Sequence, residues 1–199
     1  MIFGNEKTSA PIDAWGIDAI VAAKVADVLK ARFRVVPMQL SKEGQSALAS
    51  APGYLFGDRD GYICSLLRKQ FPGQQVNYYL RVHASERNFA NTNQVIGGLG
   101  IVHREGFNTG YTYVHALFWI EVLDGATCKS LRSQDPPYKG GNLLTGTNVP
   151  GPNLEVEPSW MPNSQTAARD SRLKEATRSL VEQALAQTLP ILFSTGASQ

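Results

Sequence analysis

The stretch Val76-Asn-Tyr-Tyr-Leu-Arg-Val-His-Ala84 decides the fold, because apolar and polar residues alternate strictly along it. Side chains at every second position of a strand share one face, so this pattern predicts a strand over 76–84. One face carries Val76, Tyr78, Leu80 and Val82, and the other carries Asn77, Tyr79, Arg81 and His83. We expect the first face to pack on a core and the second to be polar.

Further β segments lie on both sides of this stretch. Residues 95–104 are apolar but rich in glycine, and residues 112–124 have apolar side chains on both faces. The second pattern predicts one long strand that is covered on both sides. Upstream, residues 33–40 predict another strand, in which Pro37 must lie at an edge, a bulge or the end because it lacks an N–H donor.

Helical periodicity predicts four helices. The first spans 13–32 with Asp13 as its N-cap, and shorter ones span 42–50 and 59–70. The last and strongest spans 164–189, where Pro190 should end or kink it.

The order of these elements predicts a single α/β (α+β) domain over 1–199. We expect a small mixed or antiparallel sheet with helices packed on at least one face. Residues 133–163 contain six prolines and four glycines and show no sustained period. This range is predicted to be a long Pro/Gly-rich loop insertion, which is too long for a routine connection.

Composition excludes several classes of function. The 199 residues carry a net charge of +2, and lysine and arginine are spread along the chain, so we expect no nucleic-acid partner. No run approaches the ~20 apolar residues that span a bilayer, so no membrane span is expected in this chain. Ile2 and Phe3 resemble the end of a strand whose beginning is missing. We therefore expect an upstream targeting or anchor segment, with a periplasmic or membrane-anchored location.

Two cysteines, Cys64 and Cys128, are distant in the sequence. We expect two buried free thiols, because free cysteines usually behave as small buried hydrophobes. A disulfide would require an oxidising compartment and neighbouring Cα positions.

Three histidines, His83, His103 and His115, fall on the three β segments. Three imidazoles on neighbouring strands could form a zinc site with an open position. The alternation places His83 with polar residues but His103 with Leu99 and Ile101, so we predict no bound metal. A glycine bulge at 97–100 would reverse that parity and keeps the zinc hypothesis open as an alternative.

No catalytic or cofactor motif is recognisable. The run Gly97-Gly98-Leu99-Gly100 is not followed by a helix, as a dinucleotide loop requires. Asp58-Arg59-Asp60-Gly61 lacks the remaining ligands of a calcium loop. We therefore expect no cofactor, and a binding role rather than an enzymatic one.

Two surfaces are candidates for binding. In the long loop, Tyr138 and Trp160 offer large aromatic contacts to a protein partner or a second copy. Alternatively, the polar face of the sheet could make this a small-molecule-binding or enzymatic domain, with Arg81 as the counter-ion of an anion. The residues proposed for that face are Tyr79, Arg81, His83 and His115, together with Tyr113, Trp119 and Glu121.

Three segments also carry a resemblance to known proteins. They are Phe3-Gly-Asn-Glu6 leading into Asp13-Ala-Trp-Gly-Ile-Asp18, Phe118-Trp-Ile-Glu-Val-Leu-Asp124, and the end of the last helix at Leu189-Pro190. They resemble uncharacterised bacterial envelope-associated proteins. With the Asp124-Gly125 turn, the element order is distantly similar to α/β domains of the curli secretion channel subunit, the TolB N-terminal region and lipoprotein activators of penicillin-binding proteins. The resemblance implies a protein-binding role in the envelope and no active-site residue.

Overall fold

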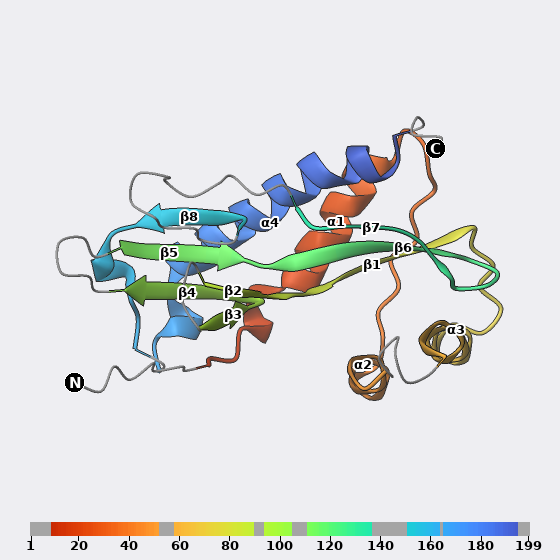
Figure 1. Cartoon of the computed structure of the whole chain (residues 1–199), viewed down its shortest axis with the longest axis horizontal. Helices are drawn as coiled ribbons and strands as arrows, with labels where there is room; N and C mark the ends of the chain where they lie inside the picture. The colour runs from red at the N-terminus through yellow and green to blue at the C-terminus, as the bar shows by residue number, and fades with distance from the viewer. Residues whose placement is uncertain are drawn as a thin grey trace.

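The computed structural model describes residues 9–51, 58–89, 94–104, 111–136, 151–163 and 165–194. These residues form four α-helices and three small antiparallel sheets (Figure 1). The predicted α+β class is confirmed, with three small sheets where one was expected.

The strands pair in three groups. The first sheet has the order β1 (Tyr78–Ala84), β6 (Phe118–Asp124) and β7 (Ser130–Gln134). The second has the order β4 (Leu99–Arg104), β5 (Tyr111–Ala116) and β8 (Asn153–Val156). The third is a hairpin of β2 (Glu86–Asn88) and β3 (Val95–Gly97).

The expected strand at 112–124 breaks at Leu117, where the chain passes from the second sheet into the first. The Leu117 N–H donates to the Gly98 carbonyl at 2.7 Å, and its carbonyl accepts from the Ser85 N–H at 3.1 Å. Gly98 has φ +59°, a left-handed conformation that glycine adopts at little cost. Odd-numbered residues remain on one face and even-numbered residues on the other across the break.

One face of the two three-stranded sheets is covered by α1 (Ile17–Leu29) and α4 (Ser171–Leu192), which lie on the same side of these sheets in Figure 1. Even-numbered side chains of β5 and β6 pack with the apolar stripes of these helices and with Trp15. The main core consists of Trp15, Val25, Leu29, Val114, Ala116, Phe118, Ile120, Leu173, Ala176, Leu180, Val181, Ala184, Leu185, Leu189 and Leu192.

The opposite face is covered in two places. At one end, α3 (Arg59–Gln70) packs on Tyr79 and Leu123, and α2 (Lys42–Ala49) packs beside it. At the other end, the β2–β3 hairpin buries Phe89 and Ile96 around Leu117. Most residues of 112–124 are therefore buried on both faces, as the apolar pattern predicts, while Trp119 is half-buried.

Two local predictions in the N-terminal half are wrong. Residues 33–40 form no strand, because their backbone pairs with none of the strands in the described residues. Phe33 and Val35 pack into the main core, and Met38 and Leu40 pack with α3. The alternating burial of residues 33–40 arises because this segment connects the main core with the cluster around α3. Asp13 does not cap α1: it begins the 3₁₀ turn η1 (Asp13–Trp15), and Gly16 is the N-cap.

The boundaries of the C-terminal half also differ from expectation. The last helix begins later, at Ser171, where the Asp170 side chain accepts from the N–H groups of Arg172 and Leu173. It continues two residues past Pro190 to Leu192. The range 133–163 is not wholly loop, since it contains β8 and the 3₁₀ turn η2 (Pro158–Trp160). A further 3₁₀ turn, η3 (Ala167–Arg169), precedes α4.

Within the described residues, none of the helices has the length and apolar character needed to cross a bilayer. Ile2 and Phe3, predicted to be the end of a strand, lie outside the described residues.

Candidate functional site

The polar face of β1 and β6 is organised around one buried carboxylate. Strand register places Arg81 opposite Glu121, whose side chain is 1% exposed. Arg81 Nη1 donates to Glu121 Oε2 at 2.8 Å, and Arg59, at the start of α3, lies 4.0 Å from Oε1. The arginine that we expected to serve as a counter-ion for a ligand therefore already binds a carboxylate of the protein.

The next residue pair along the same face is His83 and Trp119. These two residues are opposite each other in the register, and their ring centroids are 5.0 Å apart in an edge-to-face arrangement. Both side chains are half-buried. Burial lowers the pKa of His83, and the positive charge of Arg81 lowers it further. The imidazole is therefore neutral at pH 7.

The other predicted members of the polar face lie elsewhere. Tyr79 is 8% exposed and belongs to the cluster beneath α3. His115 and Tyr113 are on β5, in the second sheet, beyond the break at Leu117. The structure thus brings Arg81 and His83 together but leaves His115 separate from them.

His115 and His103 have different surroundings. His115 is 4% exposed and faces Gly100 on β4, and burial lowers its pKa to about 4. His103 is on the opposite face of the same sheet, where its Nδ1 lies 2.8 Å from Thr112 Oγ1. Over the ranges that the structure describes, no three His, Cys, Asp or Glu side chains are grouped to hold a metal ion.

The two cysteines form a disulfide, which corrects the prediction of free thiols. Cys64 on α3 and Cys128, after β6, have Cα atoms 5.3 Å apart although 64 positions separate them in the sequence. Both are buried, as expected, beside Tyr79 and Leu123. The pairing depends on how α3 docks on the sheet, and no local sequence signal reveals that docking.

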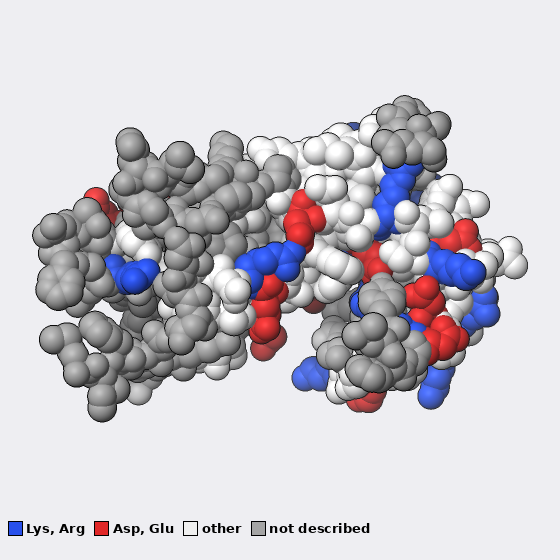
Figure 2. Space-filling model, viewed as in Figure 1, with Lys and Arg blue, Asp and Glu red and all other residues white. Residues whose placement is uncertain are grey.

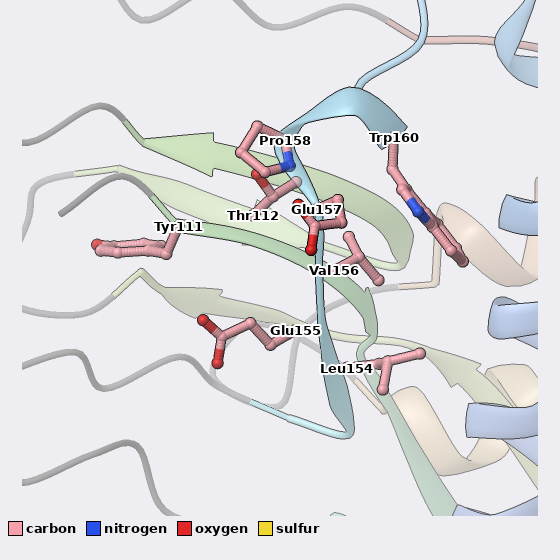
Figure 3. A pocket seen from close by; sticks show the side chains of 8 residues that line it. All are labelled: Tyr111, Thr112, Leu154, Glu155, Val156, Glu157, Pro158 and Trp160. Atoms are coloured by element: carbon pink, nitrogen blue, oxygen red, sulfur yellow. The ribbon is translucent and has the colours of Figure 1, made fainter.

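A second candidate site is an open cavity of about 520 Å³ beside β8. Tyr111 and Glu155 lie on one side of this strand, and Leu154 and Trp160 lie on the other (Figure 3). The complete lining is Tyr111, Thr112, Leu154, Glu155, Val156, Glu157, Pro158 and Trp160. The sequence signal for this strand is the alternation of polar and apolar residues over Asn153–Val156. Four alternating residues within a range rich in proline and glycine are too few to predict a strand.

Trp160 has a mixed environment. Its half-buried indole packs against the main core, and the Arg172 guanidinium lies 5.3 Å from the ring centroid. The same side chain lines the cavity, so it both holds η2 on the core and offers an aromatic surface. Tyr138, the other aromatic residue predicted to contact a partner, lies outside the described residues.

No model of a protein family, no curated protein and no solved structure matches this chain. Its function is therefore inferred from two features of the molecule itself. One is the polar face of β1 and β6, and the other is the cavity beside β8.

Proposed function

We propose that this chain is a non-enzymatic protein-interaction domain of a bacterial envelope system. The observation that carries the proposal is the open cavity beside β8. β8 is an edge strand of the second sheet, because within the described residues it pairs with β5 and with no other strand. Such an edge is a recognised template for the binding of an extended segment.

The chemistry of the cavity favours a particular kind of segment. Leu154 is 43% exposed, and its side chain and the Trp160 ring provide apolar contact area. Glu155 and Glu157 are exposed in the same lining and provide negative charge. We therefore expect the partner to supply an extended stretch with an apolar anchor and a lysine or arginine, because complementary charges guide association and fix register.

The disulfide supports the envelope location. Disulfides form and persist in oxidising compartments, such as the bacterial periplasm, and are rare in the cytosol. A buried bridge between Cys64 and Cys128 is consistent with folding after export. The same location is the one that the sequence resemblance implies.

The alternative is a small-molecule-binding or enzymatic domain built on Arg81, His83 and His115. It is less favoured because Arg81 is paired with Glu121 and His115 lies in another sheet. A catalytic acid or base must reach the group on which it acts, and these three residues do not converge.

Matched substitutions on two edge strands test the proposal. Leu154 on β8 and Leu131 on β7 are 43% and 50% exposed. Leu154→Lys should abolish capture of the partner that the wild-type full chain recovers from its native cells, whereas Leu131→Lys should leave that capture unchanged. Both variants should melt like the wild type. Equal capture by the wild type and Leu154→Lys would exclude the β8 edge as the binding surface.

Trp160→Ala separates the two roles of that side chain. Because the indole is half-buried, its removal should lower the free energy of unfolding by about 2 kcal/mol. If the ring also contacts the partner, capture should fall even at temperatures where the variant is fully folded. Unchanged capture by the folded variant would restrict Trp160 to a packing role.

A further inference from the structure

Strand β8 presents different side chains to the two faces of its sheet. Leu154 is opposite Val114 in the register with β5, and Val114 belongs to the main core. Glu155 is the next residue, so its side chain points to the opposite face. Figure 3 shows Trp160 on the side of Leu154 and Tyr111 on the side of Glu155. The cavity beside β8 therefore has an apolar wall (Leu154, Val156 and Trp160) and an acidic wall (Tyr111 and Glu155).

The apolar wall favours aliphatic side chains. Leu154 is 43% exposed, whereas Val156 and Trp160 are half-buried against the main core. The Arg172 guanidinium, which also pairs with Asp170, lies 5.3 Å from the centroid of the indole ring. Because this cation already lies over the ring, the wall offers less to a second cation than to an aliphatic group.

The acidic wall suits a basic side chain. Glu155 is exposed, and Glu157 adds a second exposed carboxylate to the same lining. The half-buried Tyr111 ring packs against Tyr113, with 5.6 Å between the ring centroids. A lysine or arginine can lay its aliphatic stem along such a ring while its charged end meets a carboxylate.

The charges of the cavity also favour a basic partner. The charged residues of the lining are both glutamates, Glu155 and Glu157. Arg104 Nη1 lies 3.5 Å from the Tyr111 hydroxyl, which points away from β8 in Figure 3. Figure 2 shows basic and acidic side chains intermixed over the part of the molecule that carries α2 and α3, so a partner of one charge gains less there.

We propose that the cavity recognises an extended segment of a partner protein in which one lysine or arginine stands between two aliphatic residues. Consecutive side chains of a strand alternate between faces, and residues paired across neighbouring strands share a face. The two aliphatic side chains therefore contact the apolar wall, and the basic side chain between them contacts the acidic wall. This inference rests on the proposed function and deepens it, because it fixes the order of residues in the partner segment.

Two pentapeptides of identical composition test the pattern. In acetyl-Thr-Val-Lys-Val-Thr-amide the valines flank the lysine, whereas in acetyl-Val-Thr-Lys-Thr-Val-amide they share its face. Titration of the full chain at pH 7, followed by the backbone amide resonances of Leu154 and Glu155, should show about tenfold tighter binding of the first peptide, because the second loses two cross-strand contacts. Equal affinities would overturn the alternating pattern while leaving β8 as a binding edge.

A charge reversal then assigns the acidic wall. Glu155→Lys should bind the lysine peptide more weakly than the wild type does, and should bind acetyl-Thr-Val-Glu-Val-Thr-amide more tightly. Glu175→Lys, at an exposed position of α4, is the matched control and should bind like the wild type. Equal affinities in Glu155→Lys and the wild type would contradict the assignment. If no peptide moves the β8 resonances, the recognition pattern is wrong, and partner capture by Leu154→Lys still decides the proposed function separately.

Discussion

The imidazole of His115 lies directly over Gly100 on the neighbouring strand. A Cβ added at position 100 would come within 2.8 Å of Cε1 and 2.9 Å of Nε2 of this ring. The two residues are opposite each other in the β4–β5 register, and the ring is almost fully buried. The glycine therefore provides the space that the histidine occupies.

Gly100→Ala should consequently destabilise the fold. The added methyl group must displace a buried ring, and overpacking of this kind costs about 1–3 kcal/mol. Chemical denaturation would measure the loss. In a His115→Ala background the same substitution should cost much less, so a double-mutant cycle should give a coupling energy well above zero. Additive effects would show that the imidazole is not the group that the added methyl displaces.

Acid should destabilise the protein through His115. Its pKa is about 4 in the folded chain and 6.5 ordinarily, because burial disfavours the charged ring. Between these two pH values the unfolded chain binds more protons than the folded chain, so the free energy of unfolding falls as pH drops. The full shift corresponds to about 3 kcal/mol.

Denaturation series from pH 7 to pH 4 would measure this loss. His83 contributes in the same direction because its pKa is also lowered. His115→Gln should have a markedly flatter pH dependence than the wild type. An unchanged slope in His115→Gln would show that other groups cause the acid sensitivity.

Reduction of the disulfide should cost substantial stability. Cys64 and Cys128 close a loop with a sequence separation of 64, for which the chain-entropy model gives about 4 kcal/mol. The wild type should therefore melt at a lower temperature when a reductant is added. The Cys64→Ala/Cys128→Ala variant should melt at that lower temperature with or without reductant. A reductant-insensitive wild type would rule out a stabilising bridge.

The buried ion pair makes Glu121 the most sensitive position on the polar face. Glu121→Leu removes the carboxylate that forms an ion pair with the buried Arg81 guanidinium and lies 4.0 Å from Arg59. Loss of one partner of a buried pair costs on the order of 3–5 kcal/mol. Glu182→Leu is a control, because its partner Arg178 is 48% exposed and such surface pairs contribute about 0–1 kcal/mol. Similar losses in the two variants would contradict this account.

Local sequence determined the helices and strands whose start, end or alternation is marked by residues within the element or next to it. Residues 59–70 form a helix as predicted, because Asp58 caps the N–H of Gly61 and the turn before Gly73 stops the helix. A strand forms over Tyr78–Ala84 within the predicted range 76–84, but its burial differs from the expected alternation, since Tyr78 is 47% exposed and Tyr79 is 8% exposed. The pairing of Arg81 and His83 on one face also follows from alternation alone, because the side-chain period of a strand is two.

Tertiary structure decided everything that depends on which segments meet. A hydrophobic pattern indicates which side chains are buried, but it does not indicate which segment the backbone pairs with. The sequence of 33–40 therefore has the pattern of a strand, although this segment forms a connection without strand pairing. The break at Leu117 depends on hydrogen bonds to Ser85 and Gly98, which the local pattern does not contain. The Cys64–Cys128 bridge and the Arg81–Glu121 pair join residues 64 and 40 positions apart. Contacts across such distances form only when the helices and sheets pack, so composition and spacing cannot reveal them.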